Sequence, residues 1–232
     1  MVGDLTGFTF FITTMAMMAA TVFFFVERNN VQGKWKLSLT VSGLITLIAA
    51  VHYYYMRDIY DTSGDSPTEI RYIDWVLTVP LMCVEFYLIL AAVGKASVGI
   101  LVRLIAYSVV MLVTGYIGEI MIPGGGSAHW IWFGIGCVAW LLIVYEIFAG
   151  EASKISAASA SGALQSAFGA LRLFVLIGWI IYPIGYILGA LSGGAPEALN
   201  VAYNIADAVN KIGFGLVIYV LAYQDSHQTA SA

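Results

Sequence analysis

Seven separate stretches of about 20 mostly apolar residues run along this 232-residue chain and constrain its fold more than any other feature. An α-helix needs about 20 such residues to cross the hydrocarbon core of a bilayer. The stretches are Phe8–Val26, Leu37–Tyr55, Tyr72–Val93, Ile100–Ile122, Trp130–Phe148, Leu171–Leu191 and Val201–Tyr223. They predict an all-α membrane protein: one domain, residues 1–232, in which seven transmembrane helices form a bundle.

The composition excludes a soluble protein. Hydrophobic residues make up 60% of the chain and charged residues 10%, whereas soluble domains carry about 45–50% and about 25%. A net charge of -4 argues against a nucleic-acid partner, which would need a clustered basic surface. Cys83 and Cys137 lie in apolar stretches, so we expect them to pack in the interior and to form neither a disulfide framework nor a metal site. The start, Met1 to Leu5, lacks a basic region, and we expect no cleavable signal peptide in this sequence.

The basic residues between the stretches predict an orientation, because Lys and Arg in short loops favour the cytoplasmic side. Seven lie in or beside the connections after the first, third and fifth stretches: Arg28, Lys34, Lys36, Lys95, Arg103, Lys154 and Arg172. The other side has Arg57 and Arg71. We therefore expect the N-terminus outside and the C-terminus in the cytoplasm. The longest connection, residues 150–169, is rich in Ala and Ser, and we expect it to be a loose link or a helix extension.

Ionisable residues inside the predicted spans point to function. Five lie well inside them: Asp74, Glu85, Glu119, Asp207 and Lys211. His52 joins them near the end of the second stretch. A charged group at the bilayer centre costs about 2.5 kcal/mol or more, so each of these residues is a functional hypothesis.

Lys211 is the most informative of these residues. A buried lysine must be paired, neutral or covalently used, and lysine amines form Schiff bases with carbonyl compounds. Asp207 precedes it by four residues, which puts both side chains on one helix face. An ion pair that only stabilises the bundle and a covalent attachment site both fit this spacing.

Asp74, Thr78 and Glu85 share one stripe of the third predicted helix, because they are four and seven residues apart. At 1.5 Å rise per residue, the two carboxyl groups are separated by roughly 16 Å along the helix axis. A cation halfway across the membrane would then have one carboxyl group on each side. This layout predicts a proton path in which one group accepts a proton and the other resupplies it.

Three runs of residues identify a family resemblance. RYIDWVLTVP at 71–80 resembles the third helix of microbial (type 1) rhodopsins, and DAVNK at 207–211 resembles their retinal-bearing seventh helix. Trp179, Tyr182 and Pro183 match a sixth-helix pocket motif of that family. Four further runs are similar to the proteorhodopsins: TVFFFVER at 21–28, GDSPT at 64–68, EFYLILAA at 85–92 and YNIAD at 203–207.

The resemblance implies all-trans retinal bound to Lys211 as a protonated Schiff base. It implies that Asp74 is the primary counterion and proton acceptor, with Asp207 as second counterion, and that Glu85 is the cytoplasmic proton donor. His52 matches the partner of the acceptor. The proton path further includes Arg71 and Thr78, and the matching pocket positions are Trp75, Met82, Phe133, Trp179 and Tyr182.

The implied function is a light-driven outward proton pump in a bacterial-type inner membrane, not an enzyme. Its implied partners are retinal, lipid, protons and further copies in a pentamer or hexamer. Two alternatives stay open: a sensory photoreceptor and a pump for another ion. Glu85 argues against the first and Asp74 against a chloride pump. Glu119 and Glu146 have no role in this scheme, and we expect them to make helix or subunit contacts.

Overall fold

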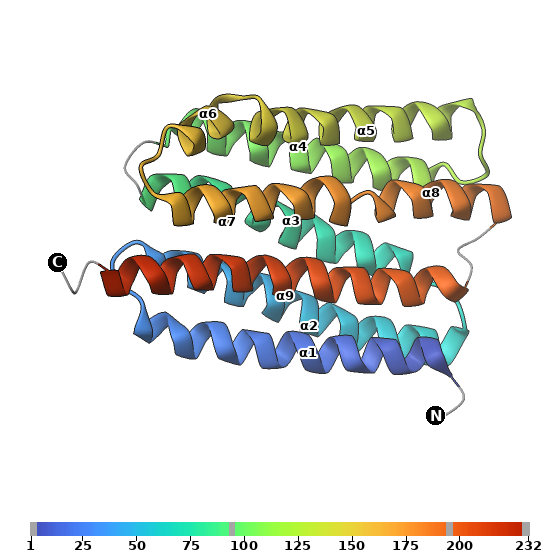
Figure 1. The fold of residues 1–232 in the computed structure, drawn as a ribbon. Helices are drawn as coiled ribbons and strands as arrows, with labels where there is room; N and C mark the ends of the chain where they lie inside the picture. The colour runs from blue at the N-terminus through green and yellow to red at the C-terminus, as the bar shows by residue number, and fades with distance from the viewer. Residues whose placement is uncertain (1–3, 93–95, 194–196, 229–232) are drawn as a thin grey trace.

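The computed structural model describes residues 4–92, 96–193 and 197–228. Within them, seven helical segments are long and apolar enough to cross a membrane, which confirms the predicted bundle (Figure 1). Val93, the predicted end of the third helix, and Lys95, used above for orientation, lie outside the described residues.

The helices follow the chain in order. The first five spans consist wholly or mainly of one α-helix each: α1 (Leu5–Glu27), α2 (Trp35–Ser63), α3 (Thr68–Ala92), α4 (Val98–Tyr116) and α5 (Ser127–Phe148). The sixth comprises α7 (Gly162–Leu173), the π-helical turn η3 (Phe174–Gly178) and α8 (Ile181–Ser192), and the seventh is α9 (Glu197–Gln228). Three short elements extend α1, α4 and α5: η1 (Arg28–Asn30), the π-helical turn η2 (Ile117–Met121) and α6 (Glu151–Ala157).

The connection at 150–169 is mostly helical, because α6 and the start of α7 fill it and only 158–161 lies between them. It therefore extends both neighbouring helices. Glu146 shapes the turn before α6: its Oε1 accepts a hydrogen bond of 3.0 Å from the backbone N–H of Ala152. Arg103 on α4 donates to both oxygens of Glu146 at 3.1 Å and to Glu151 at 2.8 Å. Glu146 thus makes the helix contact that we expected of it.

The helices form a layered bundle (Figure 1). α9 lies against α1 and α2 on one side and against α7 and α8 on the other. α4 and α5 lie on the far side of α7 and α8 from α9, and α4 also packs against α3. Leu, Ile, Val and Phe side chains cover much of the outer surface, as expected of a surface that faces lipid.

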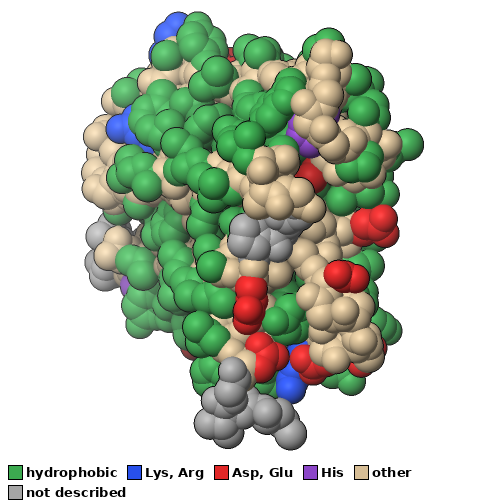
Figure 2. All heavy atoms as spheres, turned by 90° about the vertical axis from the view of Figure 1, so that its right-hand side faces the viewer, with side chains coloured by type: hydrophobic (Ala, Val, Ile, Leu, Met, Phe, Trp, Pro, Cys, Tyr) green, Lys and Arg blue, Asp and Glu red, His purple; other side chains and the backbone are tan. Residues whose placement is uncertain are grey.

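Acidic side chains gather at the end of the bundle where the α2–α3 connection lies (Figure 2). Asp61, Asp65 and Glu69 are exposed there. α2 extends eight residues past its predicted end at Tyr55. A helix can continue into water, where its residues are no longer apolar and hydropathy does not identify them. α2 ends at Gly64, whose φ of 75° is a left-handed conformation that glycine adopts without strain.

The Phe86 ring joins three spans and should contribute strongly to stability. It is fully buried, and its centroid lies 5.4 Å from that of Phe168 and 5.6 Å from that of Phe214. We expect Phe86→Ala to lower the free energy of unfolding by about 3–5 kcal/mol, because it leaves a cavity between α3, α7 and α9. Thermal denaturation in detergent measures this. Leu77→Ala is the control, since Leu77 is 47% exposed on the same helix. An equal loss in both variants would contradict the prediction.

Candidate functional site

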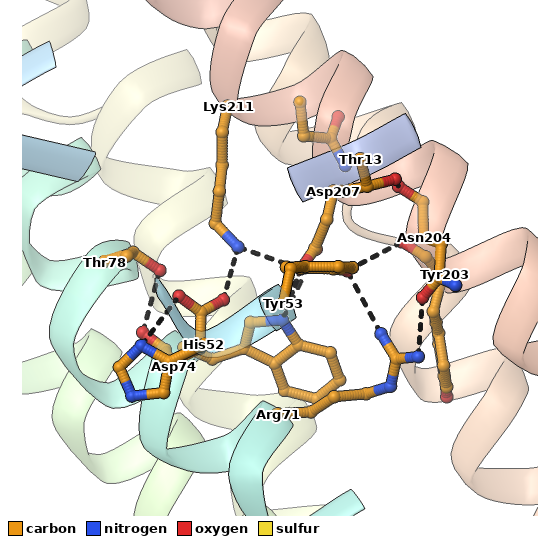
Figure 3. A network of polar contacts seen from close by, with 12 residues as sticks. Thr13, His52, Tyr53, Arg71, Asp74, Thr78, Tyr203, Asn204, Asp207 and Lys211 are labelled. Atoms are coloured by element: carbon orange, nitrogen blue, oxygen red, sulfur yellow. Dashed lines mark hydrogen bonds and ion pairs between the residues drawn. The ribbon is translucent and has the colours of Figure 1, made fainter. Parts of the chain in front are cut away.

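Lys211 lies between two carboxylates in the interior of the bundle (Figure 3). Its Nζ is 2.6 Å from Asp74 Oδ2 on α3 and 2.8 Å from Asp207 Oδ2, one turn earlier on α9. All three side chains are at most 2% exposed. The structure therefore brings together the three residues that we predicted to form the centre of the site.

Asp207 is the more heavily hydrogen-bonded of the two carboxylates. Its oxygens accept from Tyr53 Oη at 2.8 Å and from Trp75 Nε1 at 3.2 and 3.3 Å, and Tyr182 Oη also donates to it. Asp74 accepts from Lys211 through Oδ2, while its buried Oδ1 has no hydrogen-bond partner among the described residues. The two carboxylates thus differ in how strongly hydrogen bonds stabilise their charged forms, and Asp207 is the more stabilised of the two.

Arg71 occupies a buried position one turn before Asp74 on α3. Its guanidinium group donates to Tyr53 Oη at 3.1 Å and to Asn204 Oδ1 at 2.7 Å. It also donates to Asn200 Oδ1 at 3.2 Å. Tyr53 donates in turn to Asp207, so a chain of hydrogen bonds joins the guanidinium group to the carboxylate (Figure 3).

His52 and Thr78 lie beside Asp74 without hydrogen-bonding to its carboxylate. His52 Nδ1 is 3.9 Å from Asp74 Oδ1, beyond hydrogen-bond range, and 2.8 Å from the backbone oxygen of Ile48. Thr78 Oγ1 donates to the backbone oxygen of Asp74 at 2.9 Å. This bond is local to α3, because a threonine hydroxyl readily bonds the carbonyl four residues earlier.

Glu85 is fully buried and separate from this centre. Its Oε1 accepts a hydrogen bond of 2.9 Å from Ser42 on α2, and its Oε2 has no hydrogen-bond partner among the described residues. A buried carboxyl group without a nearby cation is less costly to hold protonated than ionised. The arrangement suits a group that stores a proton.

A cavity opens beside Lys211, with about 840 Å³ of empty space including its opening. Lys211 and Asp207 form part of its wall, and all five predicted pocket residues line it: Trp75, Met82, Phe133, Trp179 and Tyr182. A mostly apolar lining with a few polar groups is typical of a small-molecule site. Lys211 could therefore bear a bound carbonyl compound that extends into the cavity.

The sixth span is irregular where it borders this cavity. Pro183 has no N–H to bond the carbonyl four residues earlier, that of Trp179, and the helix is interrupted at this point. In the adjoining π-helical turn, the Gly178 oxygen accepts from Asn210 Nδ2 at 3.0 Å and the Val175 oxygen from Trp140 Nε1 at 3.1 Å. Neighbouring helices thus satisfy carbonyl groups that a regular helix would pair internally.

Sequence reasoning did not identify Tyr53, Asn200 or Ser42 as site residues. Tyr53 lies in a run of three tyrosines, of which Tyr54 and Tyr55 are exposed, so residue type alone could not single it out. Asn200 and Asn204 did have a usable signal: they continue the spacing of Asp207 and Lys211 along one face of α9.

Comparisons with known proteins agree with this geometry. Residues 4–224 match the model of a family described as bacteriorhodopsin-like protein. A green-light absorbing proteorhodopsin of Gamma-proteobacterium EBAC31A08 is 51% identical over 96% of this chain and 88% of its own length. A blue-light absorbing proteorhodopsin of Gamma-proteobacterium Hot 75m4 is 49% identical over 97% of this chain and 89% of its length. The crystal structure of a blue light-absorbing proteorhodopsin from Med12 has a TM-score of 0.81 and 45% identity, covering 96% of this chain and 100% of that one.

Removal of the central cation should destabilise the ligand-free protein. We expect Lys211→Met to lower the free energy of unfolding by about 3–5 kcal/mol, because it leaves two buried carboxylates without their shared partner. The double variant Lys211→Met with Asp74→Asn should recover part of this loss. Thermal unfolding of the ligand-free protein measures both. Arg57→Met, which breaks a half-exposed pair with Asp61, is the control and should have little effect. A double variant less stable than the single one would contradict the predicted charge balance.

Proposed function

Because the chain belongs to the bacteriorhodopsin-like family, we propose that it is a light-driven outward proton pump that carries retinal on Lys211. The observation that carries the proposal is the Lys211 amine, held between Asp74 and Asp207 at the wall of an apolar cavity. The seven spans and the similarity to bacterial proteorhodopsins indicate a multi-pass bacterial membrane protein. The family indicates a transporter rather than a metabolic enzyme.

The described residues fit retinal. The cavity has an amine for covalent attachment, aromatic walls from Trp75, Trp179 and Tyr182, and carboxylates to balance a cationic nitrogen. When bound as a protonated Schiff base, retinal supplies a light-driven isomerisation that changes the direction of the N–H at Lys211. The remaining steps belong to the protein: holding the nitrogen cationic in the dark, accepting its proton and returning another.

Asp74 is the proposed proton acceptor. Its Oδ2 is 2.6 Å from the Lys211 nitrogen, and its Oδ1 is free to take a proton. Asp207 accepts hydrogen bonds from Tyr53, Trp75 and Tyr182, and these stabilise its charged form. Transfer of a proton from Lys211 to Asp74 is therefore more favourable than transfer to Asp207, and Asp207 remains an anionic counterion. His52, whose Nδ1 is 3.9 Å from Asp74 Oδ1, is the proposed partner of the acceptor.

Arg71 is proposed to couple this step to the outer side. The N-terminal end of α3 carries Arg71 and, with the N-terminus outside, faces the external medium. A proton on Asp74 cancels one of the two negative charges near the guanidinium group. The guanidinium cation favours the ionised form of a nearby carboxyl group, so it would assist the later departure of this proton from Asp74 toward the outer side.

Glu85 is proposed to resupply the proton from the cytoplasmic side. It lies roughly 16 Å along α3 from Asp74, toward the C-terminal end of that helix. Burial next to Ser42 favours a protonated carboxyl group that can give up its proton when the Lys211 nitrogen needs one. A donor here favours a pump over a sensory photoreceptor, which does not need rapid resupply. Asp74 favours protons over chloride, since a carboxylate beside the cation already occupies the place of an anion.

The proposed location is the inner membrane, with the N-terminus outside. The excess of Lys and Arg in the short connections at the end of the bundle opposite to the α2–α3 connection supports this orientation, because basic residues favour the cytoplasmic side. We further propose assembly as a pentamer or hexamer, which the family resemblance suggests.

Illumination of cells that make this protein with added retinal should acidify the medium. A protonophore should abolish the signal, because it lets the pumped protons return. Replacement of sodium or chloride should make no difference. An external pH electrode measures the effect, with Lys211→Ala as a colourless, inactive control. A signal that persists or grows with protonophore would indicate that another ion is pumped.

Glu85→Gln should slow the return of a proton to the Lys211 nitrogen without blocking the earlier steps. The substitution keeps the shape and the contact with Ser42 but removes the transferable proton. Flash spectroscopy should show a return that is slower than in the parent, dependent on external pH and accelerated by azide, a diffusible proton carrier. Glu151→Gln is the matched control, since its carboxyl group is 44% exposed at the same end of the bundle. An unchanged return rate in Glu85→Gln would remove Glu85 from the mechanism.

A further inference from the structure

Glu119 is a carboxyl group that the pump mechanism does not use, and it lines the cavity. We propose that Glu119 is a colour-determining residue: it places a negative charge at the wall of the cavity remote from Lys211 and shifts absorption to longer wavelengths. This inference rests on the proposed retinal function and deepens it, because it assigns a second electrostatic control of the same ligand.

The position of Glu119 is built by several residues. Tyr72 Oη on α3 donates to Glu119 Oε2 at 2.7 Å. Gly115, one turn earlier on α4, leaves room for that hydroxyl: a Cβ there would lie 3.0 Å from Tyr72 Oη. Gly118 leaves room for Tyr186 in the same way, since an added Cβ would overlap its hydroxyl oxygen. Because Gly115 and Gly118 have no side chains, Tyr72 and Tyr186 can both pack close to this part of the chain.

The backbone around Glu119 is also unusual. Glu119 lies in η2, a π-helical turn, and such turns are often found at functional sites. His129 on α5 supports the turn: its Nδ1 lies 2.7 Å from the Gly118 oxygen and 3.2 Å from the Ile122 oxygen. His129 is 2% exposed. A buried histidine from the next helix thus stabilises the turn that directs Glu119 toward Tyr72.

Glu119 and Lys211 come from different layers of the bundle, with α7 and α8 between these layers (Figure 1). Glu119 follows α4, which packs against α3 and α5, whereas Lys211 is on α9, which packs against α1, α2, α7 and α8 (Figure 1). Both line one cavity, together with Phe133 and Gly136 of α5. A conjugated ligand attached at Lys211 and filling this cavity would have its far part near the α4–α5 wall.

Charges at the two sides of the cavity act on colour in opposite directions. In the ground state of such a ligand the positive charge is concentrated at the Lys211 nitrogen, and excitation moves part of it along the conjugated chain. Asp74, beside the nitrogen, stabilises the ground state and widens the energy gap. A carboxylate at Glu119 stabilises the excited state and narrows the gap.

Glu119 differs from Glu85 in two ways that favour the ionised form: it is only partly buried, and the permanent cation Arg71 lies within electrostatic range of it. Besides Tyr72, the charged or titratable residues close enough to interact with it electrostatically are Arg71, His129, Tyr186 and Tyr203. Arg71 is a permanent cation, and the tyrosines are neutral at ordinary pH. The hydrogen bond that Tyr72 donates to Glu119 Oε2 stabilises the negative charge of the ionised form.

The test compares absorption maxima of purified, retinal-bound variants at neutral pH. Glu119→Gln should absorb at shorter wavelength than the parent, and Asp74→Asn at longer wavelength. Glu119→Asp, which keeps the charge, should stay near the parent. Glu69→Gln is the matched control and should not shift, because Glu69 is an exposed carboxylate at the same end of the bundle and is not part of the cavity wall.

A coloured Glu119→Gln protein with the parent's maximum, or with a shift to longer wavelength, would overturn the inference. Should Glu119→Gln fail to take up retinal, Glu119→Leu and Glu119→Asp decide the question: a shift to shorter wavelength in Leu alone supports the inference, and equal maxima overturn it. A colourless parent would contradict the proposed function itself, whereas an unchanged Glu119→Gln band with a coloured parent overturns this inference alone.

Discussion

The structure depends on a balance of buried charge around Lys211. One lysine and one arginine face two aspartates, so this centre holds two positive and two negative charges that cancel. Tyr53 links the pairs, because it accepts from Arg71 and donates to Asp207. Isolated charges would be too costly in a membrane-spanning bundle, and here each has its partner on another turn or another helix. A proton that moves from Lys211 to Asp74 keeps the total charge and changes only its distribution.

Hydropathy predicted the seven spans well because lipid imposes a length and a composition on each of them. It failed where the constraint ends. α2 continues to Ser63, and residues 150–169 are mostly helical, because a helix in water needs local hydrogen bonds and packing rather than apolar side chains. The π-helical turns could not be predicted either, since their freed carbonyls bond to side chains of other helices, Asn210 on α9 and His129 on α5.

Part of the site could be predicted from the sequence, because lipid also restricts the composition of each span. A charged residue in an apolar span is conspicuous, so Asp74, Glu85, Asp207 and Lys211 could be found and their helix faces deduced from spacing. Contacts between helices were not readable. Tyr53 could not be distinguished from its two neighbouring tyrosines, and Thr78 shares the stripe of Asp74 but bonds only its backbone. The assigned roles come from the family resemblance and stay predictions.

The aromatic cluster of Phe86, Phe168 and Phe214 has a consequence beyond packing. Phe86 follows Glu85 in sequence, and the cluster joins α3, α7 and α9, so that the protein beside Glu85 is closely packed. A membrane that stores energy as a proton gradient loses it through any standing water wire. Close packing at this level opposes such a wire, and this favours retention of the stored gradient in the dark.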